Sequence, residues 1–116
     1  MNQRNLITTV RKPNSSIGII DIQGDVTGTA ENALMDAFSE ASNGSTRTIL
    51  LNFSGLDYMN SSGIGLLVTL LIRTQRQKQK LLACGLSPHY QEIFTLTRLN
   101  EAIGIYADEI AAMAAV

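Results

Sequence analysis

The residues best suited to chemistry lie in one short stretch of the sequence, Asn60-Ser61-Ser62-Gly63-Ile64-Gly65. An apolar run typical of a strand precedes this stretch, and a long apolar run typical of a helix follows it. The two serine hydroxyls therefore fall at a predicted helix N-terminus, where unpaired N–H groups and about half a positive charge favour an anion. A phosphate on Ser61 or Ser62 would be tolerated there, and its charge of about −1.5 to −2 would act mainly on a protein docked over the turn.

The same stretch also has a purely structural interpretation, because serine is a preferred N-cap and glycine near a helix start permits close packing. Loops that cradle nucleotide phosphates need GxxxxGK[ST] or GxGxxG, whereas this stretch has only Gly63-x-Gly65 and no neighbouring lysine. Nucleophilic catalysis is disfavoured, because Ser61 lacks a GxSxG elbow and the one histidine, His89, lies in a separate predicted helix. We therefore expect neither an enzyme nor a cofactor.

Length and composition limit the class of protein further. The 116 residues suit one small domain, so a single domain over residues 1–116 is expected. Nine basic and ten acidic residues leave a formal net charge of −1, which argues against a dedicated nucleic-acid surface. No apolar run reaches the roughly 18 to 20 residues of a membrane helix, and the polar N-terminus is unlike a secretory signal, so a cytoplasmic protein is expected.

The single cysteine and the single histidine leave no internal disulfide and no metal cluster. Cys84 lies in an apolar run and is expected to be a buried apolar residue rather than a nucleophile. His89 follows a proline at a predicted helix start and is expected to be a surface or capping residue.

Hydrophobic periodicity and turn residues predict strands and helices that alternate along the chain. The expected order is ββαβαβαβα, an N-terminal hairpin followed by helices alternating with strands, which implies an α/β fold with a mainly parallel sheet. Residues 54–60 are expected to form a loop, Asn43-Gly44 to close the first helix, and Ser87 and Asp108 to cap the last two. The expected strands are 6–10, 17–22, 48–53, 80–85 and 102–106, and the expected helices are 29–41, 61–79, 88–97 and 109–115.

The predicted helix 61–79 is apolar nearly all round, which is typical of a helix that is fully buried or partly covered by a partner. Leu66 and Leu70 are expected on the outer side, where a partner protein could rest on them. The residues expected to pack on the sheet are Ile64, Leu67, Val68, Leu71, Ile72 and Gln75. Four basic residues lie near the end of this helix: Arg73, Arg76, Lys78 and Lys80. We expect them to be solvated and to complement the helix dipole. The alternative is that they contact a phosphate or an acidic partner.

Over nearly its whole length, the chain resembles a STAS domain of the anti-sigma-factor antagonist type. The matching segments are Gly24-Asp25-Val26 after the hairpin, the strand 49–53, the turn 60–65 and the tail 99–103. In that family the turn reads Asp-Ser-[Ser/Thr]-Gly-[Leu/Ile]-Gly, and its first serine is the regulatory phosphorylation site. The resemblance thus assigns that role to Ser61, with Ser62 as the alternative.

What the resemblance implies is a partner-switching module that acts as substrate and ligand rather than as catalyst. An unphosphorylated antagonist of this type binds an anti-sigma factor that is itself a serine kinase, and phosphorylation ends the complex. A metal-dependent serine phosphatase then resets the antagonist. The residues expected to contact the partner are Asp25, Thr27, Asn60, Ser62, Gly63, Gly65, Leu66 and Leu70.

Two positions depart from the family pattern. Asn60 replaces the usual aspartate, which removes a carboxylate beside the serine but keeps a side chain able to cap the helix. Thr27 stands where many members carry an acidic residue, in a loop expected beside the serine turn. A constitutive scaffold whose turn is not phosphorylated, and a small-ligand or nucleotide sensor, are therefore kept as alternatives. The sequence allows either a monomer or a weak dimer.

Overall fold

The computed structural model describes residues 5–116 and contains a five-stranded sheet in the order β1-β2-β3-β4-β5. β1 pairs with β2 in antiparallel fashion, and the other three pairs are parallel. The predicted α/β fold with its N-terminal hairpin and four helices is therefore confirmed. The strands are β1 (Ile7–Asn14), β2 (Ile17–Val26), β3 (Thr48–Met59), β4 (Lys80–Cys84) and β5 (Gly104–Tyr106), and the helices are α1 (Glu31–Ala41), α2 (Ser61–Arg76), α3 (Pro88–Leu96) and α4 (Glu109–Ala114), with short 3-10 turns at Gly28–Ala30 and Leu99–Glu101.

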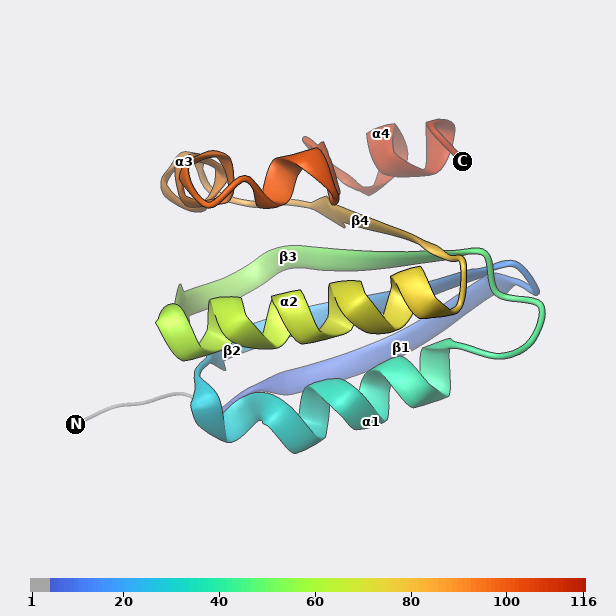
Figure 1. The fold of residues 1–116 in the computed structure, drawn as a ribbon, viewed down its shortest axis with the longest axis horizontal. Coiled ribbons are helices and arrows are strands. Elements are labelled where there is room, and N and C mark those ends of the chain that lie inside the picture. The colour runs from blue at the N-terminus through green and yellow to red at the C-terminus, as the bar shows by residue number, and fades with distance from the viewer. Residues whose placement is uncertain (1–4) are drawn as a thin grey trace.

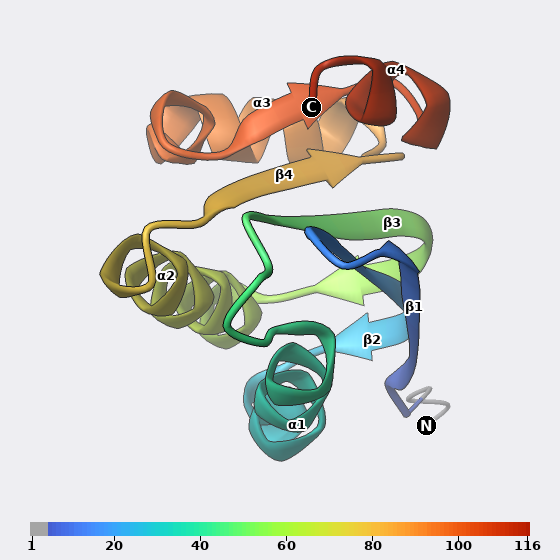
Figure 2. The ribbon, with the colours of Figure 1, turned by 90° about the vertical axis from the view of Figure 1, so that its right-hand side faces the viewer.

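Two core clusters lie on the two faces of the sheet, because successive side chains of a strand point to opposite sides. Helices α1 and α2 lie side by side on one face (Figures 1 and 2), where Ile20 and Leu51 pack with Leu34, Leu67 and the α3 residue Phe94. No helix in the described part of the chain is long and apolar enough to span a membrane.

The opposite face carries a smaller cluster. It contains Ile19, Leu50 and Leu82, and α4 covers it with Ala112. Cys84 belongs to this cluster and is fully buried, as predicted, although its Sγ also donates to Asn52 Oδ1 at 3.6 Å. Burial raises the pKa of its thiol to about 11, so the sulfur is protonated at neutral pH.

The parallel strands β2, β3 and β4 bring their carboxyl ends to one edge of the sheet, where loops lead into α1, α2 and α3. Strand β3 extends to Met59, which pairs with Val26 at the end of β2. The predicted loop at 54–60 is therefore wrong for most of its length. Two register shifts interrupt the β2–β3 ladder, one between Asn52 and Gly55 and one at Asp57. Gly55 itself pairs with Gln23, so pairing with β2 overrides the local preference of Gly55 and Asp57 for a turn.

The C-terminus of α2 lies at Arg76, three residues earlier than predicted, and is a Schellman turn. Lys78 has a left-handed backbone (φ 57°). Its N–H donates to Gln75 O at 3.1 Å, and Gln79 N–H donates to Thr74 O at 2.8 Å. The four basic residues around this end are all exposed, as predicted.

The other predicted helix caps have mixed outcomes. Ser87 and Asp108 accept hydrogen bonds from Tyr90 N and Ala111 N, which confirms both N-caps. The predicted Asn43-Gly44 cap is wrong, because α1 ends at Ala41 and the next residue is already extended.

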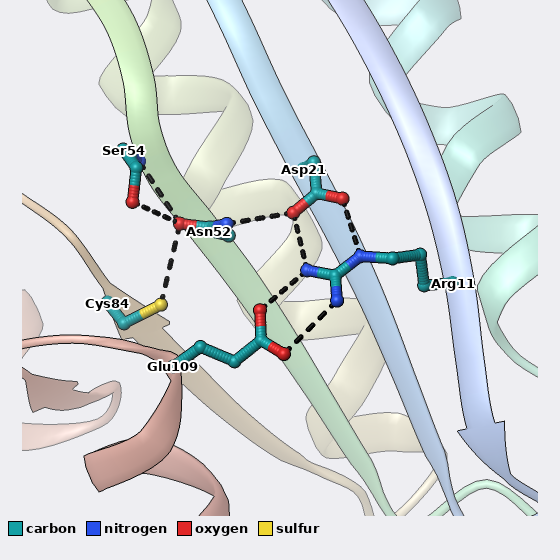
Figure 3. A network of polar contacts seen from close by, with 6 residues as sticks. All are labelled: Arg11, Asp21, Asn52, Ser54, Cys84 and Glu109. Carbon is teal, nitrogen blue, oxygen red and sulfur yellow. Dashed lines mark hydrogen bonds and ion pairs between the residues drawn. The ribbon is translucent and has the colours of Figure 1, made fainter.

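A polar network ties α4 to β1 and β2 (Figure 3). The guanidinium of Arg11 donates to both carboxylate oxygens of Asp21, at 2.7 Å each, and to both of Glu109, at 2.6 and 3.1 Å. Asn52 Nδ2 donates to Asp21 Oδ1 at 2.8 Å, and Asn52 Oδ1 accepts from the amide and hydroxyl of Ser54. Because Arg11 lies in β1 and Glu109 begins α4, these bonds fix α4 over the smaller cluster.

The network makes the stability of the fold depend on pH. Hydrogen bonds from Arg11 lower the pKa of Asp21, with a further lowering from Asn52, and hydrogen bonds from Arg11 also lower the pKa of Glu109. A carboxyl group whose pKa is lower in the folded state adds stability above its unfolded pKa, about 4, and this stability is lost as pH falls through the folded pKa.

We predict that Arg11→Met lowers the free energy of unfolding by about 1 kcal/mol at pH 7. The difference from the wild type should shrink as pH falls below about 4, because both carboxylates become protonated. Urea denaturation at pH 7 and pH 3 measures both values. Lys12→Met, which removes an exposed cation from the same strand, is the matched control. An equal Arg11→Met effect at both pH values would contradict the assignment.

Candidate functional site

The turn between β3 and α2, residues 60–63, is held by the side chain of Asn60 and by the backbone of β2; we call it the serine turn. Asn60 is the N-cap of α2, with φ −99° and ψ −176°, and its Oδ1 accepts a hydrogen bond from Gly63 N at 2.9 Å. Its own N–H donates to Val26 O at 3.3 Å, and its carbonyl oxygen accepts from Ile64 N at 3.0 Å. Asn60 therefore performs the capping expected of it and joins the helix start to the end of β2.

Gly63 lets α2 begin in direct contact with β2. A Cβ at this position would overlap the carbonyl oxygen of Val26 and would lie 2.8 Å from Met59 Cγ. Gly63 is buried, so it offers almost no surface for the partner contact expected of it, and its role in the fold is to permit close packing.

Ser61 is exposed and lies opposite the buried face of α2. At about 100° per residue, Ser61, Gly65, Val68 and Ile72 fall within about 60° of one another around the helix axis. Val68 and Ile72 are 38% and 43% exposed, and a Cβ on Gly65 would meet nothing within 4 Å. We call these four residues the α2 strip: a hydroxyl at the N-terminal end, a bare backbone next to it, and two apolar side chains beyond.

The prediction that Leu66 and Leu70 support a partner is wrong, because these side chains are 8% and 0% exposed and belong to the larger core cluster. Val68 and Ile72, predicted to face the sheet, face solvent instead. When a helix is apolar on nearly every side, its sequence does not show which side faces the sheet. The close contact at Gly63 sets the orientation of α2 about its axis. In this orientation Thr74 is buried, and its hydroxyl donates to Leu71 O at 2.8 Å.

Ser62 lies beside the loop that joins β2 to α1, as the sequence analysis expects of the serine turn. A Cβ on Gly28 in this loop would lie 3.5 Å from Ser62 Cβ and 3.7 Å from Ser62 Oγ. Asp25 is half-buried, and Thr27 is only 8% exposed with its hydroxyl 3.0 Å from that of Thr29. Thr27 therefore offers almost no side-chain surface for the partner contact expected of it.

A hydrogen bond from Met59 N to Tyr90 Oη, 2.8 Å long and buried, holds the last residue of β3. The sequence does not predict this contact, because Tyr90 simply continues the apolar side of α3. No feature of the sequence indicates which backbone group its hydroxyl reaches.

His89 is exposed, as predicted, and its ring meets the ring of Tyr90 edge-on with centroids 4.9 Å apart.

The serine turn exposes Ser61 and Ser62 and is separate from a cavity of about 520 Å³ that lies over β1, β2 and β3. The lining residues of this cavity are Asn5, Ile7, Gln23, Gly24, Gly55 and Asp57, none of them in the serine turn. Within residues 5–116, no group of three or more His, Cys, Asp or Glu side chains could hold a metal ion. An open helix start with neighbouring apolar side chains suits a protein partner better than an enclosed small ligand.

These features define a class of protein: a small α/β domain that presents a serine-bearing helix N-terminus at the carboxyl edge of a parallel sheet. The family model of the STAS domain matches residues 8–112. The chain therefore belongs to the STAS domain family, as the sequence resemblance predicts.

Solved structures with the same fold include anti-sigma-factor antagonists. An antagonist from Mycobacterium paratuberculosis superimposes with a TM-score of 0.82 at 17% identity, covering 97% of this chain and 94% of the other. The Bacillus cell fate determinant SpoIIAA in its phosphorylated form gives 0.72 at 21% identity, covering 95% and 100%. A sulfate transporter family protein from Wolinella succinogenes gives 0.76 at 15% identity, covering 90% and 87%. Identities this low show the shared fold alone.

We predict opposite effects for alanine at the two glycines of α2. Gly63→Ala should lower the free energy of unfolding by about 1 to 3 kcal/mol, because its Cβ forces α2 away from β2. Gly65→Ala, with open space around its Cβ, should raise stability by up to about 1 kcal/mol through helix propensity. Urea denaturation of both variants measures the contrast, and a Gly63→Ala variant as stable as the wild type would disprove the close contact.

Proposed function

We propose that this STAS domain is an anti-sigma-factor antagonist that works by partner switching. It binds an anti-sigma factor with serine kinase activity while Ser61 is unmodified, and phosphorylation of Ser61 releases it. A metal-dependent serine phosphatase then removes the phosphate. In this cycle, which takes place in the cytoplasm, the chain is substrate and ligand rather than catalyst. The observation that carries the proposal is the exposed hydroxyl of Ser61 at the N-terminal end of the α2 strip.

The surroundings of the two serines favour Ser61 as the phosphate acceptor. Ser61 lies on the outer side of α2, directly opposite the buried face, so an approaching kinase meets its hydroxyl first. Ser62 is also exposed, but it lies beside the β2–α1 loop, with Gly28 as its neighbour. A kinase that approaches Ser62 therefore also meets this loop, whereas Ser61 lies clear of it.

A phosphate on Ser61 can reverse binding without unfolding the domain. The helix N-terminus tolerates an added anion, so the antagonist itself is not disrupted. A partner seated on the α2 strip would instead have to desolvate a charge of about −1.5 to −2 at its interface. Each loss of about 1.4 kcal/mol weakens binding tenfold, so a few kcal/mol are enough to release the partner.

The partner's apolar contact on α2 falls to Val68 and Ile72 in place of the buried Leu66 and Leu70. These two side chains continue the strip from Ser61 by about two and three turns of the helix. Gly65 lies between, and its lack of a side chain allows a partner backbone to approach closely. The proposed interface thus combines an apolar end with a modifiable end on one helix face.

We predict that Ser61→Ala keeps partner binding and Ser61→Asp weakens it at least tenfold, because a carboxylate partly imitates the charge of a phosphate. Calorimetry with the purified anti-sigma serine kinases of the source organism, in the presence of ATP, measures binding, and phosphate transfer is followed by mass spectrometry. Ser62→Ala and Ser62→Asp are the matched pair. Equal binding by Ser61→Ala and Ser61→Asp would eliminate the switch at Ser61.

A second prediction concerns the apolar end of the strip. Replacing Val68 and Ile72 together by serine should weaken binding of the same kinase about tenfold or more, while Ser61 remains a substrate at high kinase concentration. Leu96→Ser, at an apolar side chain of α3 that is 75% exposed, is the control and should bind as the wild type does. Unchanged affinity of the double variant would show that the partner docks elsewhere.

Asn60 supports one competing function, a constitutive binding module of the same fold. It caps α2 but supplies no carboxylate beside Ser61, so kinase recognition that depends on a carboxylate would fail. Tandem mass spectrometry of the protein purified from its own host under several growth conditions separates the two functions. Phosphate on Ser61 supports the switch, and an unmodified turn in every condition supports the constitutive module.

A further inference from the structure

We propose that Tyr90 is a positioning residue for Ser61: its hydroxyl holds the end of β3 so that Ser61 is presented in one fixed place. The inference deepens the proposed function and rests on it. Tyr90 lies in the first turn of α3 and is 9% exposed, so it cannot itself be part of the surface that a kinase contacts.

The first support is the hydrogen-bonding pattern of β3. Strand β4 pairs with β3 only as far as Asn52↔Cys84, so the β4-facing edge of the later part of β3 has no strand partner. The N–H of Asn60 points to β2, where it donates to Val26 O. Because N–H groups alternate in direction along a strand, the N–H of Met59 points the opposite way, toward the side that β4 leaves open. Tyr90 Oη accepts that N–H at 2.8 Å.

The second support is how closely this bond adjoins the serine turn. Met59 is the last residue of β3, Asn60 is the N-cap, and Ser61 begins α2. On the β2 side the chain is held by Asn60 N–H, and on the other side by Met59 N–H. Loss of the Tyr90 bond would leave a buried N–H unpaired one residue before the cap and two before the serine. The cost of this unpaired N–H would therefore destabilise the segment that carries Ser61.

The third support is that Tyr90 is itself held firmly. Ser87 Oγ accepts from its N–H at 3.5 Å, and Pro88 fixes the backbone at the start of α3. The ring belongs to the larger core cluster, and His89 packs edge-on against it. A hydroxyl on so constrained a ring is a fixed acceptor, which is what an exposed turn needs if its serine is to enter a kinase site reproducibly.

The test is Tyr90→Phe, which keeps the ring in the core and removes only the hydroxyl. The matched control is Tyr106→Phe, because the Tyr106 hydroxyl makes no hydrogen bond within the described part of the chain. With the purified anti-sigma serine kinase that modifies the wild type, we expect kcat for Tyr90→Phe to fall at least fivefold, with KM changed less than twofold. We also expect amide exchange at Met59, Asn60 and Gly63, whose N–H groups are hydrogen-bonded in the wild type, to accelerate at least tenfold, while α1 exchanges as in the wild type.

The outcomes separate this inference from the proposed function. If no kinase modifies the wild type, the proposed function fails, and the local amide exchange still decides whether Tyr90 holds the turn. If the wild type is modified and Tyr90→Phe shows unchanged kcat, the positioning role is overturned. Faster exchange spread evenly over α1 and the turn would also overturn it, because that pattern indicates a merely structural loss.

Discussion

Helix α2 can begin where it does only because residue 63 has no side chain. The backbone of Gly63 meets the carbonyl of Val26, the last residue of β2, and the same carbonyl receives the N–H of Asn60. This contact fixes how far α2 stands from the sheet and how it is turned about its axis. The exposure of Ser61 and the burial of Leu70 both follow from that rotation.

The serine turn of this STAS domain is held by the ends of two strands and by one helix, so it is not a free loop. β2 contributes a carbonyl, β3 continues straight into the cap, and the helix that follows β4 contributes the Tyr90 hydroxyl. The exposed hydroxyl of Ser61 therefore lies just outside this set of hydrogen bonds. In the proposed switch, a charge added to Ser61 would change what can dock on the domain without breaking these hydrogen bonds.

The fold order and the serine turn could be predicted from the sequence because their signals are local. Caps such as Ser87 and alternating runs of strand and helix residues need no knowledge of distant contacts. The rotation of α2 could not be predicted, since leucine and isoleucine occupy nearly every side of it and only the packing of Gly63 against β2 selects one. The extension of β3 and the acceptor role of Tyr90 were missed for the same reason: each depends on a partner far away in the chain.

The bonds of Arg11 with Asp21 and Glu109 link the first strand of the domain to its last helix. Arg11 and Glu109 stand 98 positions apart, so one guanidinium closes a ring that includes most of the chain. Fraying of β1 would release the carboxylate that holds α4, and departure of α4 would take two hydrogen bonds from the edge strand. The first and last elements of the fold therefore loosen together, and a protease that gains access to one of them gains access to both.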